Sequence, residues 1–275
     1  MTKTMEEVFE ALKKKITIVD SQTSQVTTYD CEKCKDQFGW IEKREADVFG
    51  NGQLVREEEV WVTCTCVEQR RIERLAKQSQ ITEKFSEKKF SNFSSDVSDE
   101  VKSLARLAKK YFDDFNDIRH NQQNSIALLG QPGIGKTHLL MAVSNLLLAK
   151  GKQVMYFPYV STLKAMQANN FENDARITES ACKAEILFID DLYKPVDRKP
   201  QASEWQCSKM YDIINHRYLN NLPILLSSEL NFGEMLAVDE AIASRLFEMS
   251  KQYTKSINKN AKLNYRMKEL FGGAQ

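Results

Sequence analysis

The sequence predicts an α/β protein in which helices flank a parallel sheet, with a small cysteine-rich hairpin domain in front. Three observations support this prediction: apolar runs alternate with helical patterns, a glycine-rich loop joins one such run to a helix, and two close cysteine pairs lie near the N-terminus. The chain has 275 residues and is 42% hydrophobic, enough for one sizeable core plus a small module. We therefore expect two domains, residues 1–80 and residues 81–275.

Composition limits the partners and the compartment. The formal net charge is +1, so any contact with nucleic acid must be local. The N-terminus lacks the apolar core of a signal peptide, and no run approaches the roughly 20 apolar residues of a bilayer span. These features predict a cytoplasmic protein without a membrane partner. In that reducing compartment, six cysteines favour metal binding or simple burial over disulfides.

The N-terminal region combines a helical pattern with a hairpin pattern. Residues 4–15 have apolar positions at helical spacing, which predicts a short amphipathic helix. The β-prone residues 38–41 and 59–62 lie on either side of residues 50–52, Gly-Asn-Gly, a hairpin-turn signal. A hairpin would bring the second cysteine pair back beside the first.

Four thiolates converging in this way suit tetrahedral Zn²⁺. The expected ligands are Cys31, Cys34, Cys64 and Cys66. Protein ligands would fill all four positions, so the predicted role of the zinc is structural. Metal-free buried cysteines and a redox dithiol are the alternatives. The remaining Cys182 and Cys207 are expected only to pack.

Three segments precede the glycine-rich loop. Residues 68–79 read as a charged linker helix, and residues 99–115 form an amphipathic helical pattern. Between them, the apolar positions of residues 81–93 are mostly aromatic. Core packing is one interpretation of Phe90 and Phe93, and a position beside a bound adenine is the other.

Residues 130–137 match the P-loop pattern G-x-x-x-x-G-K-[ST]. They follow an apolar run, residues 125–129, and open a helical pattern over residues 138–150, so the context also fits. A chance glycine-rich turn is the alternative. Backbone N–H groups and the helix N-terminus would hold a polyphosphate, with Lys136 on the β- and γ-phosphates and Thr137 on Mg²⁺. The residues expected at the nucleotide are Gly130, Pro132, Gly133, Ile134, Gly135, Lys136, Thr137 and His138.

Two further strands and a helix follow the loop. Residues 153–157 form one strand, and Ser161 is an expected N-cap for the next helix. Residues 185–191 form a buried strand that ends in two carboxylates, at the edge of the sheet where ligands bind. Asp190 is expected to hold Mg²⁺, and Asp191 to orient or deprotonate the attacking water. A turn that merely happens to contain two aspartates is the alternative.

The C-terminal third continues the α/β pattern. Residues 203–218 predict a helix and residues 222–226 another buried strand. Residues 251–268 carry six basic side chains and no acidic one, several of them at near-helical intervals. A solvated face and a local contact with a phosphate backbone are both open interpretations.

With these motifs placed, residues 30–270 resemble the DnaC/DnaI family of AAA+ replicative-helicase loaders of bacteria and their phages. The resemblance rests on the first cysteine pair with the following Gly-Trp-Ile, on residues 90–93 (Phe-Ser-Asn-Phe), on the P-loop, and on residues 189–192. It continues in residues 203–223, residues 243–246 and residues 265–268. It implies a P-loop AAA+ core that binds ATP with Mg²⁺.

The resemblance also assigns roles to single residues. Arg245 is similar to the arginine finger that completes a neighbouring subunit's site, which implies an ATP-dependent homo-oligomer. Arg266 is similar to a sensor-2 arginine, and Ser228 occupies the sensor-1 position, where the family usually has Asn. Asp191 replaces the usual second Glu, so we expect slow, switch-type ATP hydrolysis.

By the same resemblance, the zinc domain binds a hexameric replicative DNA helicase and the AAA+ domain holds single-stranded DNA during replication initiation. Lys164, Arg176 and the basic C-terminal stretch are candidate DNA contacts. Two other functions remain open. One is a transposition helper ATPase of the IstB type, although such proteins are not expected to carry a cysteine-rich N-terminal module. The other is a non-hydrolysing, ATP-binding adaptor.

Overall fold

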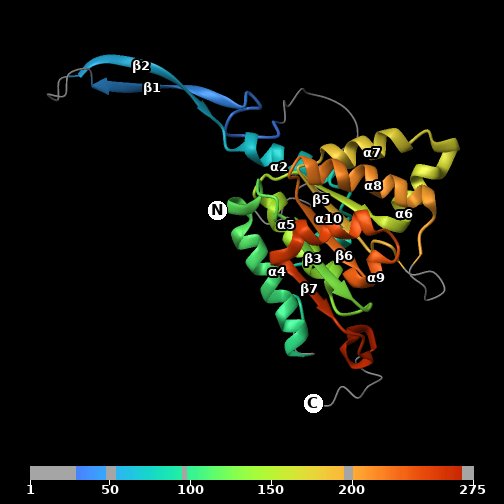
Figure 1. The fold of residues 1–275 in the computed structure, drawn as a ribbon. Coiled ribbons are helices and arrows are strands. Elements are labelled where there is room, and N and C mark those ends of the chain that lie inside the picture. Colours follow the sequence, from blue (N-terminus) through green and yellow to red (C-terminus); the bar gives the residue numbers. More distant parts are fainter. Residues whose placement is uncertain (1–28, 48–53, 95–97, 195–200, 268–275) are drawn as a thin grey trace, which may run out of the picture.

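The computed structural model describes residues 29–47, 54–94, 98–194 and 201–267. A five-stranded sheet forms its centre, in the order β4-β5-β6-β3-β7, and every neighbouring pair is parallel (Figure 1). The strands are β3 (Ile126–Gly130), β4 (Val154–Pro158), β5 (Ile186–Asp190), β6 (Ile224–Ser228) and β7 (Thr254–Ile257). The predicted parallel sheet is confirmed.

The two faces of the sheet are covered by different helices because successive side chains of a strand point to opposite sides. On one face, Ile126 and Leu128 pack in a core cluster with α4 and α5; on the other, Ala127 and Leu129 pack with α8 and α10. The first layer contains α2 (Cys66–Gln78), α3 (Glu83–Ser86), α4 (Asp99–Ile118) and α5 (Lys136–Ala149). The second contains α6 (Tyr159–Gln167), η1 (Ala168–Phe171), α7 (Asp174–Lys183), α8 (Glu204–Leu219), α9 (Phe232–Leu236) and α10 (Glu240–Ser250).

The cysteine-rich region is an antiparallel hairpin, β1 (Gly39–Asp47) and β2 (Leu54–Thr63), that projects away from the core (Figure 1). Directly after it, α2 runs back to the core, where Ile72 and Ala76 are buried among core side chains. The predicted hairpin and linker helix are confirmed. The predicted helix over residues 4–15 and the turn at residues 50–52 lie outside the described residues.

Side-chain caps begin several of the described helices, α4 and α8 among them. Ser98 accepts a hydrogen bond from the backbone N–H of Val101, and Ser203 forms a capping box with Gln206. The prediction that Ser161 is an N-cap is wrong, because α6 begins at Tyr159. The Ser161 hydroxyl lies inside the first turn, where it donates to the carbonyl of Pro158.

The basic C-terminal stretch is not one helix, although several of its basic residues recur at near-helical intervals. Residues 251–267 form η2 (Lys251–Tyr253), strand β7, η3 (Ala261–Leu263) and η4 (Tyr265–Met267). β7 extends the sheet beside β3, so this stretch is tied to the strand that precedes the P-loop. No helix in the described ranges is long and apolar enough to cross a membrane.

Candidate functional site

The P-loop connects β3 to α5 at the carboxyl end of the sheet. Gly133 and Gly135 have φ angles of +82° and +91°, a backbone region that side chains rarely adopt. A Cβ at Gly135 would lie 2.4 Å from Cε2 of Phe93. The loop is therefore wound tightly enough to direct its N–H groups at a phosphate, with the N-terminus of α5 behind them.

Lys136 is the cation of this loop and is 5% exposed. Its Nζ donates to the carbonyl oxygens of Gly130 (2.6 Å) and Gln131 (2.9 Å). Burial lowers the pKa of the Lys136 ammonium to about 8. Contact with a phosphate oxygen would thus exchange two neutral carbonyl partners for a charged one, which strengthens the hydrogen bonding.

Asp190 ends β5 with its carboxylate buried beside Thr137. The Thr137 hydroxyl donates to Asp190 Oδ1 (2.8 Å), Ser227 donates to the same oxygen, and Tyr156 donates to Oδ2 (3.0 Å). Burial raises the pKa of Asp190, and the hydrogen bond from Ser227 opposes that shift. A hydroxyl and a carboxylate oxygen side by side are hard donors that fit Mg²⁺, so Thr137 and Asp190 would hold it.

Asp191 has a left-handed backbone, with φ of +59°. Its Oδ2 lies 2.6 Å from the ammonium of Lys194, which also lies 3.3 Å from Glu229 Oε1. Lys194 and Glu229 both line the pocket beside the P-loop. The sequence reasoning missed both residues, and neither belongs to a motif that could have revealed it.

The pocket has a volume of about 550 Å³, within the usual range for small-molecule sites. Segments far apart in the chain close it. Phe93 lines it from the N-terminal side and packs edge-on against His138, with ring centroids 5.3 Å apart. Phe90 is not among the lining residues and packs against the core cluster, as Phe93 also does. Of the two aromatic residues, the structure thus brings Phe93 to the pocket.

The C-terminal segment folds back over the P-loop. The backbone N–H of Tyr265 donates to Gly133 O (3.0 Å), and Arg266 lines the pocket as expected of a nucleotide contact. The side-chain amide of Gln131 donates to the backbone carbonyl of Asn260 and accepts from the backbone N–H of Asn260, and each bond is 2.6 Å long. The sequence predicted Arg266 as a site residue but not this contact.

Ser228 and Arg245 are not among the described residues that line the pocket. The Ser228 hydroxyl is fully buried and donates to Leu192 O (2.7 Å). The hydroxyl of the neighbouring Ser227, which the sequence did not predict as a site residue, donates a hydrogen bond to Asp190 instead. Arg245 on α10 donates from Nε to Asn215 Oδ1 (3.0 Å) and from Nη1 to Ala241 O (2.8 Å).

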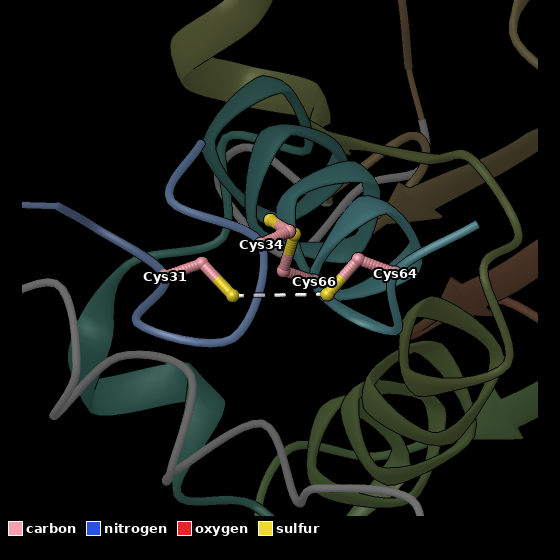
Figure 2. Close-up of side chains that lie close together, drawn as sticks. All are labelled: Cys31, Cys34, Cys64 and Cys66. Carbon is pink, nitrogen blue, oxygen red and sulfur yellow. Dashed lines mark hydrogen bonds between the residues drawn. The ribbon is translucent and has the colours of Figure 1, made fainter. Parts of the chain in front are cut away.

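A second candidate site lies at the base of the hairpin, where the four predicted zinc ligands converge (Figure 2). All four Sγ atoms lie within 4.8 Å of one another, and the Cys31–Cys64 and Cys34–Cys66 pairs are 3.7 Å and 3.5 Å apart. Four sulfurs around Zn²⁺ at about 2.3 Å would be about 3.8 Å apart, so the cluster fits zinc.

The cluster is also tied to the helix that follows it. Cys66 is the first residue of α2, and Arg70 of α2 pairs with Asp36 in the loop that carries the first cysteine pair. Asp36 in turn accepts a hydrogen bond from the backbone N–H of Cys31 (3.1 Å). Hydrogen bonds, first of all from the backbone N–H of Cys34, lower the pKa of the Cys31 thiol to about 7, whereas burial raises the pKa of the Cys66 thiol to about 12. The case for zinc therefore rests on the geometry of the four sulfurs.

The sequence and the fold have recognisable relatives. The family model of IstB-like ATP binding proteins matches residues 51–268. The chain is 40% identical over 251 residues to the phage-like element PBSX protein XkdC of Bacillus subtilis (strain 168), covering 89% of this chain and 88% of that protein. It is 44% identical over 207 residues to the uncharacterized protein YqaM of the same strain, covering 74% of this chain and 66% of that protein.

Among solved structures, the fold is similar to the crystal structure of DnaI, with a TM-score of 0.53 and 18% sequence identity. The superposition covers 68% of this chain and 95% of that one. At this identity the likeness concerns the fold alone, and it agrees with the predicted parallel sheet flanked by helices around a P-loop.

Proposed function

This chain belongs to the family of IstB-like ATP binding proteins, and we propose that within it the protein is an ATP-dependent loader. Its client would be a hexameric replicative helicase, which it would deliver to single-stranded DNA at origins. The observation that supports this proposal is the cysteine cluster joined by α2 to the AAA+ core. The hairpin β1–β2 projects from the core and would hold the client (Figure 1). Residues 1–80 would then be the client-binding domain and residues 81–275 the nucleotide-binding domain.

The nucleotide chemistry would use the residues around the P-loop. Backbone N–H groups and Lys136 would hold the phosphates, and Thr137 and Asp190 would hold Mg²⁺, which supplies charge neutralisation at the γ-phosphate. Asp191 would accept a proton from the attacking water. The ammonium of Lys194 lies 2.6 Å from Asp191 Oδ2 and would compete with that water for the carboxylate, so hydrolysis would be slow, as a switch needs.

Arg245 would complete the site of a neighbouring subunit. Arg245 lies on α10 and does not line the pocket of its own chain. Its guanidinium carbon lies 5.2 Å from the ring centroid of Tyr211 and 5.5 Å from that of Tyr218. A side chain that acts in the next subunit requires head-to-tail packing, and hence a ring or an open spiral.

The experiment is to incubate the tagged full-length chain with candidate replicative helicases, with and without ATP and Mg²⁺, and to size the complexes. We expect a stable complex whose composition changes with ATP for the wild type and not for Lys136→Ala. If no helicase forms a complex under any nucleotide condition, the proposed function is wrong.

A transposition helper is the second candidate, because the matching family model is named for IstB. In that case the chain would bind a transposase rather than a helicase in the same sizing experiment. A non-hydrolysing adaptor would show equal, near-zero ATP hydrolysis in the wild type, Asp191→Asn and Arg245→Ala. A loader predicts a wild-type rate above both variants.

A further inference from the structure

The carboxylate of Asp190 is held from three separate elements. Thr137 of α5 and Ser227 of β6 donate to Oδ1, whereas Tyr156 of β4 donates to Oδ2 at 3.0 Å. Each carboxylate oxygen therefore has a fixed donor. The tyrosine belongs to no sequence motif, and it is the group that occupies the oxygen turned away from Thr137.

Tyr156 is itself held rigidly. Its ring lies against Phe85 (centroid distance 5.7 Å, interplanar angle 62°) and Phe188 (5.2 Å, 53°), and the residue is 7% exposed. Its backbone N–H donates to the carbonyl of Ser79, 2.8 Å away. Because the ring is packed and the backbone is fixed, the hydroxyl is positioned by the fold rather than by its bond to Asp190.

This arrangement has a consequence for metal binding. A carboxylate that is free to rotate can present either oxygen, or both, to a metal ion. The free energy of metal binding is then reduced by the entropy cost of fixing the carboxylate in one orientation. Mg²⁺ demands near-ideal octahedral geometry, so it is sensitive to the direction of each ligand. With Oδ2 occupied by the Tyr156 hydroxyl, Oδ1 is the oxygen that remains directed at Thr137.

We propose that Tyr156 is a positioning residue that aims Asp190 at the Mg²⁺ of the bound nucleotide. This inference rests on the proposed nucleotide site. It adds a contact from β4 to the metal-binding machinery contributed by α5, β5 and β6.

The test uses the full-length chain with Tyr156→Phe, which removes the hydroxyl and keeps the ring. Tyr253→Phe is the matched control, because the Tyr253 hydroxyl also donates to a carboxylate, that of Asp114 (2.7 Å), and Tyr253 does not line the pocket. Binding of a fluorescent ATP analogue is measured across a Mg²⁺ titration and again in EDTA. Thermal unfolding confirms that each variant is folded.

We expect Tyr156→Phe to need about 10-fold more Mg²⁺ for half-maximal binding, the lower end of the effect of partners that orient a metal ligand. Its affinity in EDTA should equal that of the wild type, and Tyr253→Phe should match the wild type in both conditions. An unchanged Mg²⁺ requirement would overturn the inference. So would equal weakening with Mg²⁺ and in EDTA, because that result reports a distorted pocket instead.

The same titration separates this inference from the proposed function. If the wild type requires Mg²⁺ and Lys136→Ala fails to bind, the nucleotide site stands, and only the role of Tyr156 is decided by the variant. If wild-type binding is indifferent to Mg²⁺, both the inference and the proposed mechanism are wrong.

Discussion

Among single residues, Asp191 is the one that we propose to accept a proton from the attacking water. A lysine ammonium bound to its carboxylate would compete with that water for the carboxylate oxygens. Lys194 lies 2.6 Å from Asp191 and 3.3 Å from Glu229, so it has a second carboxylate to which it can shift. The slow turnover that we propose has a specific cause in this pair.

Lys194→Met is therefore expected to raise basal ATP hydrolysis at saturating ATP. An ion pair this exposed contributes up to about 1 kcal/mol, which limits the increase to about 5-fold. Lys183→Met, which removes a lysine that pairs with Glu179 on α7, is the matched control and should leave the rate unchanged. Steady-state phosphate release measures both. A lower or unchanged rate in Lys194→Met would show that this lysine does not restrain Asp191.

Among the structural elements, the hairpin and the C-terminal segment each depend on a few contacts. The hairpin has exposed apolar side chains, including Ile41 and Trp61, which face each other across the strands. Two strands alone are marginally stable in water, so the cysteine cluster at their base is the natural source of order.

We expect the purified chain to bind one zinc ion, measured by elemental analysis of metal per chain. Replacing any one of the four clustered cysteines with serine should lower the zinc content to near zero, because a structural site needs all four ligands. Cys182→Ser and Cys207→Ser are the controls and should keep the metal, since both cysteines lie outside the cluster. Full zinc content in Cys31→Ser would contradict the assignment.

Two hydrogen bonds between the side chain of Gln131 and the backbone of Asn260 join the C-terminal segment to the P-loop, in addition to the bond from Tyr265 to Gly133. Gln131→Ala removes both bonds, each worth about 1 kcal/mol net, so hydrogen exchange in residues 257–267 should be roughly 10-fold faster or more. Gln122→Ala is the control, because Gln122 bonds Tyr218 and Glu248. Equal exchange in both variants would mean that other contacts hold the segment.

In the whole molecule, the decisive question is whether one subunit completes the site of the next. Asp191→Asn and Arg245→Ala should each hydrolyse ATP on the order of 10³-fold more slowly than the wild type. Mixed in equal amounts, they should regain activity, because about a quarter of the head-to-tail interfaces would pair an intact Asp191 with an intact Arg245.

The matched control for this mixing experiment combines Asp191→Asn with Lys136→Ala. Both changes disable the same half of the interface, so no arrangement of these subunits restores a complete site. Recovery in that mixture, or its absence when Asp191→Asn and Arg245→Ala are combined, would contradict the role assigned to Arg245.

Most of the sheet could be predicted because β3, β4, β5 and β6 are continuous apolar runs buried on both faces. β7 could not, since it is a short edge strand, Thr254–Ile257, that contains polar residues and lies within a basic stretch. Hydrogen bonding to β3 stabilises β7 as a strand, although its own sequence does not predict one.

The candidate site divides in the same way. The P-loop and Asp190 could be found from the sequence because their chemistry depends on residue types at fixed short spacing. Tyr156 and Ser227 could not, since each reaches the Asp190 carboxylate from another strand. Lys194 lies only three positions from Asp191, but it belongs to no motif, and its second partner, Glu229, is distant in the chain. The expected site residue Ser228 lies one position from Ser227, and local sequence does not settle which of two adjacent hydroxyls reaches Asp190.

The sequence by itself determined the parallel sheet, the nucleotide loop, the hairpin and the four clustered cysteines, because periodicity and short-range spacing are local properties of a chain. Only the tertiary structure decided which side chains surround Asp190 and Asp191, and what closes the pocket. The physical reason is the distance along the chain. The Gln131–Asn260 pair spans 129 positions and the Tyr156–Asp190 pair spans 34, and these contacts arise only when β3 pairs with β7 and β4 with β5 in the sheet.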